Sequence, residues 1–160
     1  MDSNTQIGPL ARKDLVLHLR EQVSRSMRMG AHVLFKHPHT PRKGFFYPPT
    51  ILTHIKPEMS VFAEETFGPV AAIISSDSPS HAIELANRTE YGLGASIWTR
   101  DIQKAEALAY KIQAGNVFIN KNVASDPRIS FGGIKQSGYG KELGEMGIKE
   151  FVNAKTIWVK

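Results

Sequence analysis

Apolar residues recur along most of the chain at the intervals expected of helices and strands. From residue 11 to 29 they fall on every fourth position, as in an amphipathic helix: Leu15, Leu19, Val23 and Met27. Gly30 follows as a C-terminal cap. Shorter apolar runs predict strands at residues 31–35, 50–54, 69–75, 94–99, 117–120 and 155–160. Further helices are expected after a cap at Asp77 or Ser78, from Asp101 to about Ala114, and from Leu143 to Phe151.

The order of these elements predicts an α/β fold. Strand, helix, strand, helix, strand between residues 69 and 120 indicates right-handed crossovers and a mainly parallel sheet with helices on both faces. The run at 69–75 is almost continuously apolar, which is typical of a strand buried on both faces. Ligands in such sheets bind beyond the carboxyl ends of the strands, so the loops after Ser75, Thr99 and Asn120 are candidate sites. The third is the longest.

Composition narrows the class of protein. The chain has 160 residues, of which 41% are hydrophobic and 22% charged, as expected of one packed, soluble domain. It shows no apolar run long enough to cross a bilayer and no signal-type start, so no membrane contact and a cytoplasmic location are expected. The net charge of +5 comes from scattered basic residues, and therefore no nucleic-acid partner is expected.

The sequence gives little support for a metal site or for a cysteine nucleophile. The chain has no cysteine, which excludes disulfides, thiolate metal sites and a cysteine nucleophile within it. The histidines at 32, 37, 39 and 54 invite a metal interpretation, but no third ligand stands at a recognisable spacing. They are interpreted as loop histidines, and no metal is predicted.

The glycines of the long loop resemble two nucleotide-binding motifs without matching either. Gly133 and Gly138 have the spacing of a phosphate-binding loop, but Tyr139 stands where that motif requires lysine. Gly138, Gly140 and Gly144 have the wrong spacing for a dinucleotide fingerprint, and no strand directly precedes them. These residues are interpreted as turn glycines.

A compact polar stretch, Ala63–Val70, lies at the mouth of the strand predicted at 69–75. It reads Ala-Glu-Glu-Thr-Phe-Gly-Pro-Val, with two adjacent carboxylates, an aromatic residue and a Gly-Pro turn. Local chemistry leaves open whether Glu64 and Glu65 bind a ligand or solvate a loop. The strand at 155–160 leaves a similar choice, between pairing with another chain and closing this chain's own sheet.

Three stretches together resemble the aldehyde dehydrogenase superfamily. They are Glu-Glu-Thr-Phe-Gly-Pro-Val at 64–70, Asn-Arg-Thr-Glu-Tyr-Gly-Leu at 87–93, and Phe-Gly-Gly-Ile-Lys-Gln-Ser-Gly-Tyr-Gly-Lys-Glu-Leu-Gly at 131–144. Their order and spacing match the C-terminal portion of that family, and residues 7–10 and 47–52 extend the match upstream. The resemblance covers essentially the whole chain.

The resemblance implies oxidation of an aldehyde by NAD or NADP. In the family a cysteine thiolate attacks the carbonyl, and a thiohemiacetal and then a thioester form on it. That cysteine, an oxyanion-stabilising asparagine, a catalytic glutamate and the dinucleotide-binding domain all lie upstream of the matched region. The resemblance therefore implies part of a catalytic domain at 1–152 and an oligomerisation strand at 153–160. No catalytic residue is expected here, and the chain alone should be inactive.

The resemblance also assigns cofactor and substrate contacts. Glu65 matches the carboxylate that accepts hydrogen bonds from the nicotinamide ribose, and Phe67 matches the aromatic residue beside the nicotinamide. Only that end of NAD or NADP would touch this chain, while Glu64 keeps its interpretation as a solvated loop residue. The loop from 120 to 131 matches the lining of the aldehyde tunnel, with Phe131 near its end.

The tunnel loop indicates a substrate. Residues Ser-Asp-Pro-Arg at 125–128 resemble the loops of succinate semialdehyde dehydrogenases, in which a serine, here Ser125, helps to hold the substrate carboxylate. Arg128 is either a second partner of that carboxylate or a residue that fixes the loop or an interface, and the second interpretation is favoured.

The family resemblance also bears on assembly. The C-terminal strand of the family commonly joins a neighbouring subunit's sheet, so a homo-oligomer through 153–160 is expected. Two other classes of function stay open. One is a non-catalytic binding or assembly module derived from this fold, and the other, less favoured, is a free-standing nucleotide-binding domain.

Overall fold

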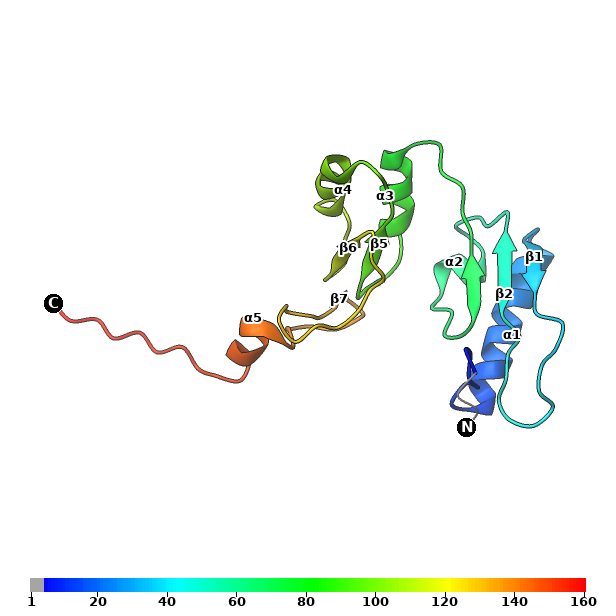
Figure 1. Ribbon diagram of the computed structural model, residues 1–160, viewed down its shortest axis with the longest axis horizontal. Coiled ribbons are helices and arrows are strands. Elements are labelled where there is room, and N and C mark those ends of the chain that lie inside the picture. The colour runs from blue at the N-terminus through cyan, green and yellow to red at the C-terminus, as the bar shows by residue number, and fades with distance from the viewer. Residues whose placement is uncertain (1–4) are drawn as a thin grey trace. The chain divides into compact units, whose positions relative to one another are not determined.

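The protein, in a computed structural model, is described over residues 5–160 and forms two compact units that divide between Asp77 and Ser78 (Figure 1). The sequence predicted one packed domain with one core. Of the apolar side chains that are buried in the described residues, nine lie in the first unit and only Ala105 and Phe131 in the second. The predicted boundary between residues 152 and 153 does not coincide with the division between Asp77 and Ser78, and it stays a prediction.

The first unit packs helices against a three-stranded sheet. Its elements are α1 (Lys13–Arg28), β1 (His32–Lys36), β2 (Thr50–Thr53), α2 (Ser60–Ala63) and β3 (Val70–Ala72). Strand β2 lies in the middle, antiparallel to β1 and parallel to β3. The core between α1 and the sheet consists of Val16, Leu19, Val23, Ala31, Tyr47, Leu52, Ile55, Met59 and Val61.

Helix α1 confirms the predicted amphipathic helix but buries a face that is rotated from the predicted one. The predicted stripe ended at Met27, which is 47% exposed. The buried face contains Gln22 and Ser26 instead. Polar residues were not counted as core, yet both are buried because each finds a hydrogen-bond partner in the segment 60–65.

Two strands of the first unit lie at sheet edges and are more exposed than their sequences indicate. The segment 69–75 was predicted to be buried on both faces, and that prediction is wrong. Ala71 is exposed and Ile73 is 49% exposed, because only the other face of β3, with Val70, Ala72 and Ile74, packs against the core. All five residues of β1, the opposite edge, are exposed.

The second unit contains short elements. They are α3 (Pro79–Asn87), β4 (Tyr91–Gly92), β5 (Ala95–Ile97), α4 (Ile102–Ala109), β6 (Val117–Ile119), β7 (Ile134–Lys135) and α5 (Gly144–Lys149). Two predicted caps are confirmed: the Ser78 hydroxyl accepts from the amide of His81 at 3.1 Å, and the Asp101 carboxylate accepts from that of Lys104 at 3.0 Å. Helix α4 ends at Ala109, earlier than predicted.

The sheet differs from the single, mainly parallel sheet that was predicted. The described strands form three small sheets, in which β2–β3 and β5–β6 are parallel while β1–β2 and β4–β7 are antiparallel. The sequence missed β4 and β7 because both are two residues long and glycines surround β7. The α/β class itself holds.

Beyond α5 the chain continues without helix or strand to its last residue (Figure 1). The predicted strand at 155–160 therefore has no paired neighbour among residues 5–160. Its side chains Ile157, Trp158 and Val159 are 79%, 88% and 86% exposed. Pairing with a second chain stays a prediction.

Candidate cofactor and substrate loops

The carboxylate of Glu64 is held against helix α1 at the start of the loop between α2 and β3. It accepts a hydrogen bond from Gln22 Nε2 at 3.0 Å and another from Arg25 Nη2 at 3.0 Å. Burial alone would raise the pKa of Glu64, but the hydrogen bonds from Gln22 and Arg25 outweigh burial and lower it. The interpretation of Glu64 as a merely solvated residue is therefore wrong.

Helix α1 also fixes the backbone on both sides of Glu65. Gln22 Nε2 donates to the Glu65 carbonyl oxygen at 2.9 Å. Further along, Gly68 lies so close to Leu19 that a Cβ on it would come within 2.4 Å of Leu19 Cδ2. On the other side, the Val61 amide donates to Ser26 Oγ at 3.1 Å. The loop is thus tied to one face of α1.

Glu65 and Phe67 both face solvent from this loop. Glu65 is exposed and Phe67 is 64% exposed. Within residues 5–160 no hydrogen bond or ion pair reaches the Glu65 carboxylate. An open carboxylate two residues from an open aromatic ring fits a ligand that offers hydroxyl donors next to a flat ring, as the ribose and nicotinamide of NAD or NADP do.

The loop that carries Ser125 begins at the carboxyl ends of two parallel strands, β5 and β6. Asn120, directly after β6, has φ 52°. Its side-chain amide binds both the backbone N–H and the backbone C=O of Thr99. Its Oδ1 accepts from the Thr99 amide, and its Nδ2 donates to the Thr99 carbonyl oxygen, each at 2.8 Å. The amide side chain thereby continues the strand pairing by one step and sets where the loop leaves the sheet.

Within this loop Arg128 is engaged by Asp126. Its Nε and Nη2 donate to the two Asp126 carboxylate oxygens at 2.9 and 2.6 Å, and its backbone amide donates to Oδ1 at 3.0 Å. The hydrogen bonds from Arg128 hold the pKa of Asp126 far below its ordinary value, and the pKa of Arg128 is raised in turn. This geometry fits the favoured interpretation of Arg128 as a loop-fixing residue. Ser125 is exposed beside the pair.

Phe131, at the end of the loop, is built into the second unit. Its amide donates to the Glu142 carbonyl at 2.7 Å, and its own carbonyl accepts from the Glu142 amide at 2.8 Å. The residue is 8% exposed and lines one side of a shallow hollow of about 510 Å³ together with Lys141, Tyr139 and Phe151. Ser125 and Phe131 belong to one loop but lie in different surroundings.

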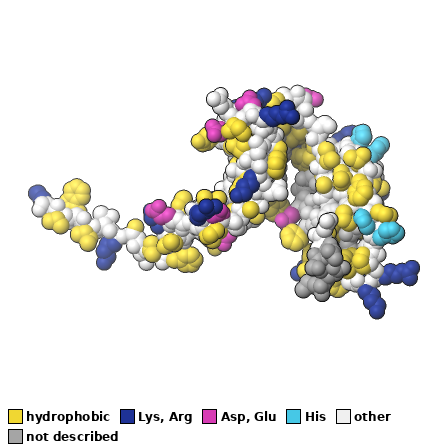
Figure 2. All heavy atoms as spheres, viewed as in Figure 1, with side chains coloured by type: hydrophobic (Ala, Val, Ile, Leu, Met, Phe, Trp, Pro, Cys, Tyr) yellow, Lys and Arg dark blue, Asp and Glu magenta, His cyan; other side chains and the backbone are white. Residues whose placement is uncertain are grey.

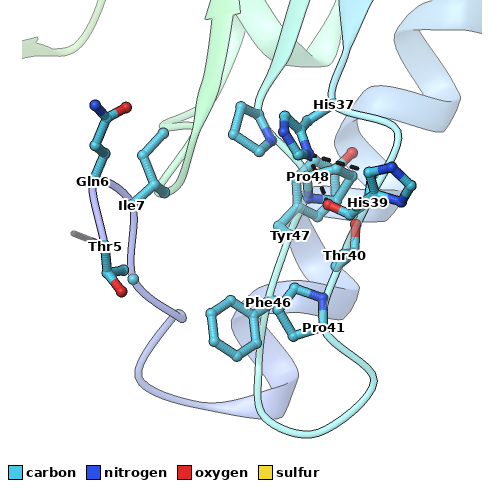
Figure 3. A pocket seen from close by; sticks show the side chains of 12 residues that line it. Thr5, Gln6, Ile7, His37, His39, Thr40, Pro41, Phe46, Tyr47 and Pro48 are labelled. Atoms are coloured by element: carbon cyan, nitrogen blue, oxygen red, sulfur yellow. Dashed lines mark hydrogen bonds between the residues drawn. The ribbon is translucent and has the colours of Figure 1, made fainter. Parts of the chain in front are cut away.

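A separate hollow of about 360 Å³ lies in the first unit between residues 5–8 and the loop 37–49 (Figure 3). None of the four predicted site residues lines it. Its two histidines are engaged with each other, since the His37 ring contacts the His39 carbonyl oxygen at 2.8 Å. In the described part of the chain no group of three or more His, Asp or Glu side chains is arranged to hold a metal ion.

The comparisons with known proteins agree with the sequence motifs. A model of the aldehyde dehydrogenase family matches residues 1–157. The chain belongs to the aldehyde dehydrogenase family. Among the helices of residues 5–160, none is long and apolar enough to cross a membrane.

Two curated relatives are named for succinate semialdehyde. The chain is 45% identical over 157 residues to the NAD(P)+ succinate semialdehyde dehydrogenase Sad of Escherichia coli, covering 98% of this chain and 34% of that protein. It is 48% identical to a probable NADP(+) succinate-semialdehyde dehydrogenase of Synechocystis, covering 98% and 35%. The chain thus spans about a third of the length of these relatives.

Solved aldehyde dehydrogenases share the fold. A succinic semialdehyde dehydrogenase from Streptococcus pyogenes, in complex with NADP+, matches with a TM-score of 0.92 at 36% identity, covering 99% of this chain and 35% of that one. A betaine aldehyde dehydrogenase from Staphylococcus aureus, with NAD+, matches with a TM-score of 0.86 at 32% identity, covering 94% and 31%.

Two of the aldehyde dehydrogenase stretches, 87–93 and 131–144, meet in the second unit. Lys135 Nζ donates to the carbonyl oxygens of Asn87 and Thr89, each at 2.9 Å, at the C-terminal end of α3. Gln136 Nε2 donates to the Glu90 carboxylate at 2.7 Å, and Lys135 pairs with Tyr91 across β4–β7. These residues hold the unit together, a role that motif matching alone did not assign.

Glycines of the second unit allow close approach of the backbone as well as turns. A Cβ on Gly115 would lie 1.8 Å from the Gly132 carbonyl oxygen, and one on Gly133 would lie 2.7 Å from Ser137 Cβ. Gly138 and Gly140 have φ of 140° and 70°, which supports the turn interpretation at those two positions. The signal that sequence reasoning missed was long-range, because the contacts of Gly115 lie 17 residues away at Gly132.

Proposed function

We propose that this chain contributes the C-terminal part of an NAD(P)-dependent aldehyde dehydrogenase that oxidises succinate semialdehyde to succinate. The observation that carries this proposal is the identity of 45–48% to two curated relatives named for that substrate, over 98% of the chain. Residues 1–152 would form part of the catalytic domain, and 153–160 would pair with another subunit. A cytoplasmic location accompanies this proposal.

The cofactor would meet the chain at the loop after α2. When bound, NAD or NADP accepts the hydride that leaves the aldehyde carbon. The Glu65 carboxylate would accept hydrogen bonds from the ribose hydroxyls, and the Phe67 ring would pack beside the nicotinamide and keep water from that side. The exposure of both side chains supports these roles.

The aldehyde would meet the chain at the loop after β6. The Ser125 hydroxyl would donate a hydrogen bond to the carboxylate of succinate semialdehyde, with the loop held in place by the Arg128–Asp126 pair. Phe131 would close the inner end of the tunnel with its apolar ring. Since the chain has no cysteine, the nucleophile must come from another segment, and the chain alone should be inactive.

A chimaera tests this function. In it, the 160 residues replace the matching segment of the E. coli relative, and turnover of succinate semialdehyde is measured with NAD and with NADP. We expect turnover by the chimaera and none by the chain alone. Replacing Ser125 with alanine should raise KM for succinate semialdehyde about tenfold, as one charge-assisted hydrogen bond is lost, and leave KM for butanal unchanged. A folded but inactive chimaera, or turnover by the chain alone, would contradict the proposal.

A second candidate, a non-catalytic assembly module, is favoured by one observation. Apolar side chains remain exposed over α5 and the C-terminal segment (Figure 2), among them Ile148, Phe151 and Trp158 at 71%, 90% and 88%. Apolar surface of this kind marks contact regions between proteins. An inactive chimaera together with strong self-association of the chain would favour this candidate over the first.

A further inference from the structure

Gln22, Arg25 and Glu64 form a cluster that we call the α1 clasp. Gln22 is 0% exposed and uses one nitrogen, Nε2, for both the Glu64 carboxylate at 3.0 Å and the Glu65 carbonyl oxygen at 2.9 Å. Arg25 Nη2 adds a charged hydrogen bond to the same Glu64 oxygen at 3.0 Å. The clasp joins Glu64 to residues that lie 39 and 42 positions away in the sequence.

The backbone conformation links the clasp to the direction of Glu65. Glu64 is extended, with φ −110° and ψ 158°. Successive side chains on an extended backbone point to opposite sides. When the clasp turns Glu64 inward against α1, it therefore turns Glu65 outward, which agrees with the lower exposure of Glu64 and the higher exposure of Glu65.

A contribution to stability does not by itself explain the clasp. Gln22 Oε1 and Arg25 Nε are buried and have no hydrogen-bond partner in the part of the chain that the structure describes. Leaving a buried polar atom unsatisfied costs more stability than a partly exposed ion pair contributes. Apolar residues would fill this place at lower cost, so the arrangement needs a reason other than the packing of α1.

We propose that Gln22, Arg25 and Glu64 are positioning residues for the cofactor, holding the backbone of 64–67 so that Glu65 and Phe67 face the nicotinamide ribose. This inference rests on the proposed function, because it concerns the same loop. The three side chains act through Glu65 and touch no substrate themselves. Loosening the clasp should weaken cofactor binding while the aldehyde site, built on the other unit, keeps its affinity.

The chimaera described above provides the first test. Replacing Glu64 with glutamine keeps the shape of the side chain but removes the charge that Arg25 and Gln22 bind. We expect KM for the cofactor to rise about tenfold, while KM for succinate semialdehyde changes less than about twofold. Glu64→Asp, which keeps the charge, should recover part of the affinity. Arg28→Gln on the exposed side of α1, where Arg28 pairs with Glu21, is the matched control and should change neither KM.

A second measurement uses the 160-residue chain itself. In Glu64→Gln, hydrogen exchange should accelerate more at the amides of residues 65–68 than in β2, where the rates follow only the global loss of stability. Exchange that rises no more at 65–68 than in β2 would overturn the clasp, as would equal rises in both KM values, because a merely structural role predicts those results.

The variant Glu65→Gln separates the two proposals. If it leaves the cofactor KM unchanged, the cofactor assignment in the proposed function fails. If Glu65→Gln raises that KM but Glu64→Gln does not, the cofactor assignment survives and the clasp fails. A rise in both variants, with the aldehyde KM unchanged, supports both proposals.

Discussion

Glu64 and Glu65 are chemically identical neighbours that the fold places in opposite environments. Glu64 faces two donors on α1, and its pKa is lowered, whereas Glu65 faces solvent. The sequence stretch Glu-Glu contains no signal for this difference. It arises because Gln22 and Arg25, one helix turn apart on α1, meet the first carboxylate and the extended backbone turns the second one away.

The lowered pKa of Glu64 predicts a pH dependence of stability. Folding favours the ionised form, so the contribution is present above the ordinary pKa of glutamate, about 4.3, and is lost as pH falls through the lowered value in the folded chain. Besides Gln22 and Arg25, the Ser60 hydroxyl faces this carboxylate, and Glu21 shares Arg25 at 3.8 Å. Glu64→Gln should be less stable than the natural chain at pH 7, and the difference should shrink below about pH 4.

Urea unfolding of both chains at pH 7, 5, 4 and 3 checks this expectation. The denaturation midpoints should converge at the acid end. Midpoints that stay equally far apart at every pH would show that the carboxylate charge is not what the clasp uses.

Among the elements, the contact between Gly115 and Gly132 limits substitution most sharply. A Cβ on Gly115 would fall 1.8 Å from a carbonyl oxygen, which the backbone can relieve only by moving the turn before β6 away from the segment before β7. Gly115→Ala should therefore destabilise the second unit by about 2–3 kcal/mol or more. Gly8→Ala is the matched control, since a Cβ there meets nothing within 4 Å and should change stability little.

Hydrogen exchange resolved by segment measures this effect. In Gly115→Ala, amides of β5 and β6 should exchange faster, while those of β2 in the first unit keep their rates. Equal exchange in Gly115→Ala and Gly8→Ala would mean that the close approach does not constrain the chain.

The elements that could be predicted are those with local signals. Ser78 and Asp101 cap helices through contacts three residues away, and both were predicted correctly. Strand β7 and the inward turn of Glu64 depend on contacts with residues 39 or more positions away, which periodicity cannot detect. The burial of β3 was overestimated because an apolar run does not reveal whether one face of a strand or both faces are covered.

At the scale of the whole molecule, the sequence motifs identified the family, whereas single residues did not establish their own roles. The aldehyde dehydrogenase assignment rested on stretches whose order spans the chain, and the comparisons bear it out. The roles of Glu65, Phe67, Ser125 and Phe131 stay predictions. Glu65 and Phe67 lie in one unit and Ser125 and Phe131 in the other, and the cysteine that would define the reacting atom is absent from the sequence.

The C-terminal segment yields a prediction about assembly. Residues 153–160 have no partner strand in the described part of the chain, and Trp158 is 88% exposed. Removing 153–160 should shift the chain toward monomer, because the apolar side chains and free backbone groups that would pair between subunits are lost. Sedimentation velocity of both forms over a hundredfold range of concentration measures the shift. Replacing Lys149, on α5, with glutamine is the control and should leave assembly unchanged; identical sedimentation of the full and shortened chains would contradict the prediction.

The exposure of strand β1 affects how the purified protein behaves in solution. It reads His-Val-Leu-Phe-Lys, lies at a sheet edge, and is exposed at every position, with Leu34 at 64%. Such an edge offers unpaired backbone groups beside apolar side chains, and only the charge of Lys36 at one end discourages stacking of one copy on another. Stock solutions should therefore become cloudy at a lower protein concentration than those of a variant with Leu34 replaced by lysine.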